Sequence, residues 1–282
     1  MKDKHSKLFA SAGARLAAAG VESSDYELRL LLAAAMGVDS LCLNDIPNAE
    51  QTALFEQMLQ KRLQHMPVDK ILGHRGFYKY DFKVNTDVLS PRPDTETLLE
   101  EALDCIKADG AATVLELGVG SGCIITSLLA ETPSLQGTGV DISAPALRVA
   151  RQNADMLGVM PRLKLLNASW FDADFLSLFS QRFDIIVSNP PYIPSAEIPS
   201  LEEDVKNYDP LPALDGGSDG LDSYRRIAEL APRLLTEQGR ILLEVGENQA
   251  RDVVAIFVGA GLKLAKIRND LSGIERCVSL KK

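Results

Sequence analysis

From Ala111 to the C-terminus, short apolar segments alternate with longer amphipathic ones, and this alternation limits the possible folds more than any other feature. The apolar segments predict seven strands, at residues 112–117, 136–140, 162–167, 183–188, 239–245, 262–267 and 275–280. The longer segments predict helices at residues 122–131, 144–157, 219–236 and 248–259. Continuously apolar strands separated by helices are typical of a parallel sheet covered on both faces. We therefore expect an α/β fold whose ligand site lies beyond the carboxyl ends of its strands.

Residues 1–75 have a different pattern, because their apolar side chains recur at helical spacing. The spacing predicts one helix that ends at Gly20, a second over residues 25–36 with Asp25 as its cap, and a third over about 49–64. Short amphipathic helices of this kind form a small bundle. These residues contain no catalytic constellation.

Residues 76–95 are expected to link the two halves. The segment GFYKYDFKVNTDVL alternates aromatic or β-branched residues with polar ones, with Asn85 near its middle, which predicts a short hairpin. Asp94 or Thr95 is then expected to cap a helix whose first turn is rich in glutamate.

The charge balance disfavours one class of partner. The 282 residues include 30 Lys and Arg against 39 Asp and Glu, a net charge of −9. Residues 1–75 carry nine of each sign, so the whole excess of acid falls in residues 76–282. A non-specific grip on a nucleic acid backbone needs many cations, so we expect no stable nucleic acid partner.

The sequence also predicts no membrane span and no metal. No segment has 18 or more apolar residues, and Arg15 interrupts the only apolar stretch near the N-terminus. The four cysteines are scattered without a C-x-x-C pair, and the three histidines do not cluster with them. We therefore expect a cytoplasmic protein with reduced cysteines, among which Cys123 is a packing residue rather than a nucleophile.

A glycine-rich turn follows the first strand of the sheet: Gly118-Val119-Gly120-Ser121-Gly122. Alternate glycines let the backbone bend sharply and approach a ligand closely. Its spacing is not that of the G-x-G-x-x-G dinucleotide fingerprint, and no G-K-[ST] follows, which disfavours ATP or GTP hydrolysis. A tight strand-to-helix turn without a ligand would look the same.

Asp141 ends the second strand. An acidic side chain at this position accepts hydrogen bonds from the ribose hydroxyls of a nucleoside cofactor in many sheets of this kind. It could equally cap the helix that begins near Ser143.

The fourth strand ends in Asn189-Pro190-Pro191-Tyr192. Two prolines fix the backbone and remove two donors, which leaves a rigid turn with open carbonyl acceptors. The Asn189 side-chain oxygen and the Pro190 carbonyl together could accept both hydrogens of one NH2 group, with Tyr192 packed beside a planar group. This pattern predicts a site for a planar nitrogen, either an amide or an exocyclic amine.

The combination resembles the S-adenosylmethionine-dependent methyltransferases that modify NH2 nitrogens, and in particular the release factor glutamine methyltransferases. Further matching segments are PRPDTE at 91–96, SNPPYI at 188–193, residues 208–225, Glu244-x-Gly246-x-x-Gln249 and Asp270-x-x-Gly273-x-x-Arg276. Val119 and Glu116 depart mildly from the family pattern. The resemblance implies a Rossmann-like class I methyltransferase domain with a seven-stranded sheet over residues 96–282. It also implies a substrate-docking role for the helical domain.

The resemblance also assigns roles. It implies that S-adenosylmethionine is held by the glycine turn and by Asn189, with its ribose on Asp141 and its adenine beside Trp170, and leaves as S-adenosylhomocysteine. The target amide would be held by Asn189, Pro190, Pro191 and Tyr192 of the turn after the fourth strand. Arg92 and Thr95 lie in the right region without a firm role. The implied substrate is the glutamine of the Gly-Gly-Gln loop in class I peptide chain release factors.

We expect direct in-line methyl transfer to nitrogen, without a covalent enzyme intermediate or a general base, because acceptors on the amide stabilise the charge that develops there. An adenine-N6 methyltransferase acting on DNA or RNA is the main alternative, since adenine presents the same NH2 group. It would need base flipping and a basic track, which the charge disfavours. A non-catalytic binding module would predict degenerate motifs, whereas these are complete.

Overall fold

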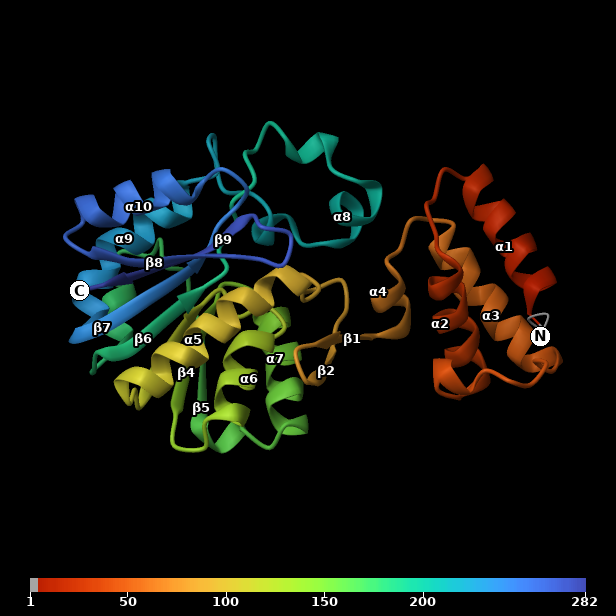
Figure 1. Cartoon of the computed structure of the whole chain (residues 1–282), viewed down its shortest axis with the longest axis horizontal. Coiled ribbons are helices and arrows are strands. Elements are labelled where there is room, and N and C mark those ends of the chain that lie inside the picture. The colour runs from red at the N-terminus through yellow and green to blue at the C-terminus, as the bar shows by residue number, and fades with distance from the viewer. Residues whose placement is uncertain (1–4) are drawn as a thin grey trace. The chain divides into compact units, whose positions relative to one another are not determined.

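The computed structural model describes residues 5–282, which form two compact units (Figure 1). The helical unit contains the described residues up to His74 together with Glu202–Tyr208. The sheet unit contains Arg75–Leu201 and Asp209–Lys282. Each has a hydrophobic core of its own.

Four helices from the N-terminal part of the chain build most of the helical unit: α1 (Ser6–Ala18), α2 (Asp25–Met36), α3 (Ala49–Arg62) and α4 (Val68–Leu72). The three predicted helices are confirmed, and α3 ends two residues earlier than expected. The short helix α8 (Glu203–Tyr208) belongs to this unit as well. It is held there because the Tyr208 hydroxyl donates to the Gln64 carbonyl at 2.6 Å, and Lys70 Nζ donates to the Tyr208 carbonyl at 2.5 Å.

The predicted helix caps are wrong in two places. Ser24, not Asp25, caps α2: its hydroxyl accepts from the Glu27 N–H at 3.2 Å, and the Glu27 carboxylate accepts from the Ser24 N–H in return. Neither Asp94 nor Thr95 caps α5 (Glu96–Asp109) with its side chain, because a 3-10 turn over residues 93–95 leads directly into that helix.

A hairpin at the start of the sheet unit pairs β1 (His74–Phe77) with β2 (Tyr80–Lys83). Its turn lies at Tyr78 and Lys79, where Tyr78 takes a left-handed conformation with φ of 55°. The hairpin was predicted, but Asn85 is not in its middle: it follows β2 and accepts from the Asp87 N–H instead. The turn was hard to predict because tyrosine rarely adopts positive φ.

Seven strands form one sheet in the order β5-β4-β3-β6-β7-β9-β8, as expected for the class I methyltransferase fold. They are β3 (Thr113–Leu117), β4 (Gln136–Asp141), β5 (Leu163–Asn167), β6 (Phe183–Ser188), β7 (Leu235–Glu244), β8 (Lys263–Asn269) and β9 (Glu275–Lys281). β7 begins four residues before the predicted strand, and its register with β6 shifts after Leu235.

The first five strands of this order are parallel, but β9 runs antiparallel to both β7 and β8. The expectation of a purely parallel sheet is wrong here. A tight turn over residues 270–274, closed by a hydrogen bond from the Asp270 N–H to the Ile274 carbonyl, joins β8 to β9. Such a short connection joins only antiparallel neighbours.

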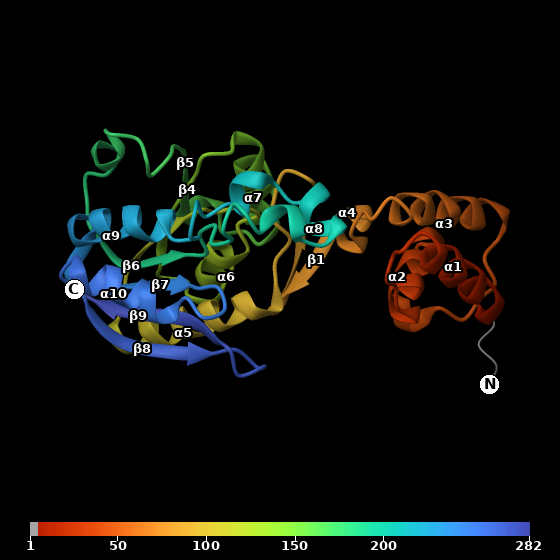
Figure 2. The ribbon, with the colours of Figure 1, turned by 90° about the horizontal axis from the view of Figure 1, so that it is seen from above.

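Helices cover both faces of the sheet (Figure 2). α5, α6 (Cys123–Glu131) and α7 (Ala144–Met156) pack on one face, and α9 (Asp222–Leu234) and α10 (Ala250–Gly259) pack on the other. Successive strand residues alternate between the two cores: Val114 belongs to the first and Leu115 to the second. With both faces covered, the site is expected in the loops at the carboxyl edge of the parallel strands.

Candidate active site

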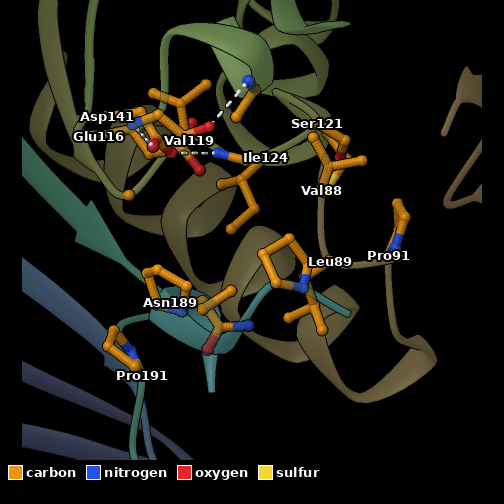
Figure 3. A pocket seen from close by; sticks show the side chains of 18 of the residues that line it. Val88, Leu89, Pro91, Glu116, Val119, Ser121, Ile124, Asp141, Asn189 and Pro191 are labelled. Atoms are coloured by element: carbon orange, nitrogen blue, oxygen red, sulfur yellow. Dashed lines mark hydrogen bonds between the residues drawn. The ribbon is translucent and has the colours of Figure 1, made fainter. Parts of the chain in front are cut away.

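Three loops meet at the carboxyl edge of the sheet, after β3, β4 and β6. These strands are neighbours, because Leu117 of β3 pairs with Val140 of β4 on one side and with Ser188 of β6 on the other. A pocket opens at this edge, with Glu116 and Asp141 on one wall and Asn189 on another (Figure 3). The fold thus brings the glycine turn, the acidic residue and the proline turn together around one pocket.

Eight of the eleven residues predicted for the site line this pocket: Gly118, Val119, Gly120, Ser121, Asp141, Trp170, Asn189 and Pro191. The other three, Gly122, Pro190 and Tyr192, do not.

The glycines of the turn have different roles. Gly118, Gly120 and Gly122 all have positive φ, which favours glycine at each position. Gly118 and Gly120 face the pocket. At Gly122 a Cβ would lie 3.0 Å from the Ala150 Cβ on α7, so this glycine allows α6 and α7 to pack closely.

Asp141 is buried against the glycine turn. Its carboxylate accepts from the Gly120 N–H and from the Ser143 N–H, both at 2.8 Å. Burial raises its pKa, and these two hydrogen bonds oppose the rise. Ser143 is the residue that caps α7, since its hydroxyl accepts from the Ala146 N–H. Each oxygen of Asp141 keeps a further lone pair that a hydroxyl can use.

Glu116 lines the pocket although it was not predicted to do so, and in the sequence it stands out only as a departure from the family pattern. Its side chain is 1% exposed and accepts from the Ile125 N–H at 3.1 Å. Burial raises its pKa well above the usual range, and the nearby Asp141 raises it further. A desolvated carboxylate in a pocket wall is stabilised by a cationic ligand group. The signal was a carboxylate inside an otherwise apolar strand.

Trp170 forms both a wall of the pocket and part of the core on the α9 face. Its ring lies 3.6 Å from where a Cβ on Gly118 would be, and its backbone is fixed because Arg226 Nε donates to its carbonyl at 2.8 Å. Within residues 5–282 its indole N–H has no partner. A flat aromatic wall beside the glycine turn suits a planar base.

The proline turn is held rigidly from several sides. The Ser188 hydroxyl donates to the Leu117 carbonyl at 2.7 Å, which joins the ends of β6 and β3. The Gln249 amide donates to the Tyr192 carbonyl at 3.0 Å. Gly220 comes so close that a Cβ there would lie 2.3 Å from the same carbonyl oxygen. These contacts leave the turn little freedom to move.

Within the turn, Asn189 and Tyr192 have different surroundings. Asn189 Nδ2 donates to the Thr95 hydroxyl at 3.3 Å, so its Oδ1 is the atom available as an acceptor. Tyr192 packs against the core instead, where burial raises the pKa of its phenol to about 12.

Several further residues line the pocket, and of these only Arg92 and Thr95 were expected in this region, without a firm role. They come from the segment before α5, from the ends of β4 and α6, and from the loop before α9: Asp87, Val88, Leu89, Ser90, Pro91, Arg92, Thr95, Ile124, Ile142, Pro210, Pro212 and Ala213. Arg92 donates to the buried carboxylate of Asp209 at 2.9 Å, which ties two of these segments together. Most of the others are apolar side chains, which carry no chemical signal in a sequence, so only the fold reveals them.

Cys123 follows the glycine turn, and burial raises the pKa of its thiol to about 12. The thiol therefore stays protonated near neutral pH and is a poor nucleophile. No three His, Cys, Asp or Glu side chains between residues 5 and 282 gather in a way that could hold a metal ion. Over the same residues, no helix has the length and apolar character to cross a membrane.

Comparisons with known proteins give the family of the chain. Residues 93–200 match the family described as Methyltransferase small domain, and residues 7–73 match the PrmC N-terminal domain. Over 268 residues the chain is 44% identical to a release factor glutamine methyltransferase of Rhodospirillum rubrum, covering 94% of this chain and 81% of that protein. The chain belongs to the release factor glutamine methyltransferase family. The relative of the same name from Cereibacter sphaeroides is 45% identical over 269 residues, covering 94% of both chains.

Solved structures support the fold assignment. A methyltransferase from Pyrococcus furiosus has a TM-score of 0.53 at 15% identity and matches 73% of this chain and 91% of its own. The hMettl16 catalytic domain has a TM-score of 0.56 at 13% identity and matches 70% of this chain and 74% of its own. This family member therefore has the methyltransferase sheet that the sequence predicts.

Proposed function

We propose that this chain transfers a methyl group from S-adenosylmethionine to the side-chain amide nitrogen of the glutamine in the Gly-Gly-Gln loop of class I peptide chain release factors. The observation that carries the proposal is the position of Asn189. It stands on the wall of a pocket that is also lined by the glycine turn and by Asp141, whose carboxylate suits ribose hydroxyls. Two relatives over 40% identical are named release factor glutamine methyltransferases.

The pocket residues fit the proposed cofactor. Asp141 offers lone pairs for ribose hydroxyls, Trp170 offers a flat face for adenine, and Glu116 offers a desolvated carboxylate to a cation. Gly118 and Gly120 leave the backbone accessible to the methionine part. When bound, S-adenosylmethionine supplies an electrophilic methyl group on a positively charged sulfur.

The residues of the proline turn act on the amide. A glutamine amide is a weak nucleophile because its nitrogen lone pair is delocalised into the carbonyl. Asn189 Oδ1 and the Pro190 carbonyl would accept its two N–H groups, orient the nitrogen and stabilise positive charge that develops on it. Pro191 would complete the substrate-side wall, and Tyr192 would keep the turn rigid from the core behind it. Fixing the orientation of the reactants before the reaction lowers the activation barrier by up to about 7–11 kcal/mol in favourable cases.

The helical unit is proposed to dock the release factor. What supports this is its match to the PrmC N-terminal domain and its balanced charge. The segment between α2 and α3 also exposes the apolar side chains of Val38, Leu41 and Ile46. Because the proposed substrate works with the ribosome, the proposal implies a cytoplasmic location. The excess of acidic residues supports the expectation of no stable nucleic acid partner.

Methyl transfer from labelled S-adenosylmethionine to purified release factor tests the proposal, with Asn189→Ala as the variant. We expect kcat to fall by about 10²–10³ while cofactor binding is largely kept, because the variant removes an acceptor for the substrate amide and leaves the glycine turn, Asp141 and Trp170 unchanged. Asn269→Ala is the matched control, since that exposed side chain only donates to the Gly273 carbonyl at the β8–β9 turn. Transfer to unmethylated DNA or RNA offered in the same reaction would instead favour the adenine-N6 alternative.

A further inference from the structure

A buried carboxylate that the proposed reaction does not use lies directly behind Asn189. Glu244 is the last residue of β7, and its neighbour Leu243 pairs with Ser188, so Glu244 stands beside the start of the proline turn. Its side chain is 2% exposed and lies outside the pocket wall. Its backbone is fixed because the Tyr224 hydroxyl donates to its carbonyl at 2.8 Å. Burying a carboxylate is costly, so its presence here calls for a role.

Thr95 and Asn189 are the neutral polar side chains next to the Glu244 carboxylate. Asn189 Nδ2 donates to the Thr95 hydroxyl at 3.3 Å, so that hydroxyl keeps its own hydrogen for another acceptor. Glu244 Oε2 is buried and has no hydrogen-bond partner within residues 5–282. This carboxylate oxygen is therefore the acceptor available to the remaining hydrogens of Thr95 and Asn189.

This arrangement fixes which way the Asn189 amide points. An ionised carboxylate can only accept, so Glu244 excludes the flipped amide, whose oxygen would face it. Asn189 Oδ1 is left on the pocket side, where an acceptor for the substrate NH2 is needed. A neutral amide or a protonated acid at position 244 could donate and would remove this constraint.

The charged surroundings of Glu244 are mixed. Arg276 is held next to it, because its guanidinium donates to the Val245 carbonyl at 3.1 Å and pairs with Asp270 and Asp94 at 3.3 Å. Burial raises the pKa of Glu244 to about 7, while Thr95, Arg276 and Asn189 oppose the rise. The titratable and charged groups that face it are Asp94, Cys123, Tyr192, Tyr224, Arg276 and Cys277.

We propose that Glu244 is a positioning residue for methyl transfer: together with Thr95 it orients the Asn189 amide so that Oδ1 points toward the substrate. This inference rests on the proposed function, since it assumes that Asn189 receives the substrate amide. It assigns Glu244 no contact with either reactant.

The test is Glu244→Gln, which keeps the shape of the side chain but adds a donor. We expect kcat for release factor methylation to fall about 10- to 100-fold, with the cofactor Kd unchanged within about twofold, because a turned Asn189 misplaces the acceptor. In the parent protein kcat should decline as the pH falls below about 7, where Glu244 takes up a proton. In the variant that decline should disappear. Glu247→Gln is the matched control, because Glu247 is exposed on the loop after β7.

A double variant separates positioning from general damage. If Glu244 acts through Asn189, adding Glu244→Gln to Asn189→Ala should lower kcat less than about twofold further. Should Glu244→Gln fail to fold, Thr95→Val breaks the same chain of hydrogen bonds and should lower kcat with the same loss of pH dependence. Full activity of Glu244→Gln with an unshifted pH profile, or additive losses in the double variant, would overturn the inference. If the parent protein methylates no release factor, the proposed function fails instead.

Discussion

Gly220 gives the sharpest test of whether the rigidity of the proline turn matters. It has φ of 75°, and a Cβ there would lie 2.3 Å from the Tyr192 carbonyl oxygen and 2.7 Å from Gln249 Nε2. Ordinary van der Waals contact begins near 3.4 Å, so in Gly220→Ala the backbone at position 220 and the Tyr192 carbonyl must move apart by about 3.4 − 2.3 ≈ 1.1 Å. A misplacement of about 1 Å costs on the order of 10²-fold in rate.

Gly158→Ala is the matched control in the same unit. Gly158 has a similar φ of 67°, but a Cβ there would meet nothing within 4 Å. The free energy of unfolding of both variants should fall by about 1–2 kcal/mol, because alanine is unfavourable in this left-handed backbone conformation. Only Gly220→Ala should lose a further 1–3 kcal/mol or so from overpacking. At about 2–4 °C per kcal/mol, its Tm should therefore fall below that of the control.

The assay compares kcat, the cofactor Kd and the Tm of the two variants. We expect Gly220→Ala to lose about 10²-fold in kcat while it still binds S-adenosylmethionine, and Gly158→Ala to keep its kcat. Equal kcat values for the two variants would refute the claim that the rigidity of the proline turn matters for the rate.

Three further perturbations follow from the hydrogen bonds and burial. Asp141→Asn should weaken S-adenosylmethionine binding about 10- to 100-fold by calorimetry, because its NH2 would face a backbone N–H; unchanged affinity would contradict the ribose role. Asn153 Nδ2 donates to the Ser121 and Lys83 carbonyls at 2.8 and 3.1 Å, and Asn153→Asp would replace this donor by a charged acceptor. The free energy of unfolding should fall by about 3 kcal/mol in denaturant titrations, and an unchanged midpoint would refute this. The pKa of Glu244 is about 7 in the folded protein and 4.5 in the unfolded chain, so between these values the folded state keeps a proton that the unfolded chain releases. The free energy of unfolding therefore falls as the pH rises through this window, by roughly 3 kcal/mol in total. The Tm of Glu244→Gln should therefore rise relative to the parent protein between pH 5 and 8, and a constant difference would argue against a buried acid.

The order of elements and the place of the site were predictable because they depend on local patterns. Apolar strands between amphipathic helices indicate the sheet, and Asp141 and Asn189 were identified because polar residues that end buried strands are conspicuous. Local exceptions escaped prediction. The turn at Tyr78 uses a conformation that tyrosine rarely adopts, and Ser24 caps α2 although Asp25 is an equally good cap by residue type.

The support behind the site could not be predicted, because it is made of distant contacts. Thr95, Asn189 and Glu244 are separated by about 94 and 55 positions in the chain and meet only when β6, β7 and the start of α5 come together. Gly122 shows the converse. It belongs to a conspicuous motif, yet the fold uses it to pack two helices rather than to line the pocket.

The central claim is that this chain methylates a release factor glutamine from the pocket at Asn189. The most direct measurement incubates purified protein, class I release factor and methyl-labelled S-adenosylmethionine, then locates the label by tandem mass spectrometry. We expect a single methyl group on the side-chain nitrogen of the Gly-Gly-Gln glutamine, lost with Asn189→Ala. Label on another residue, or label that survives in Asn189→Ala, would contradict this account.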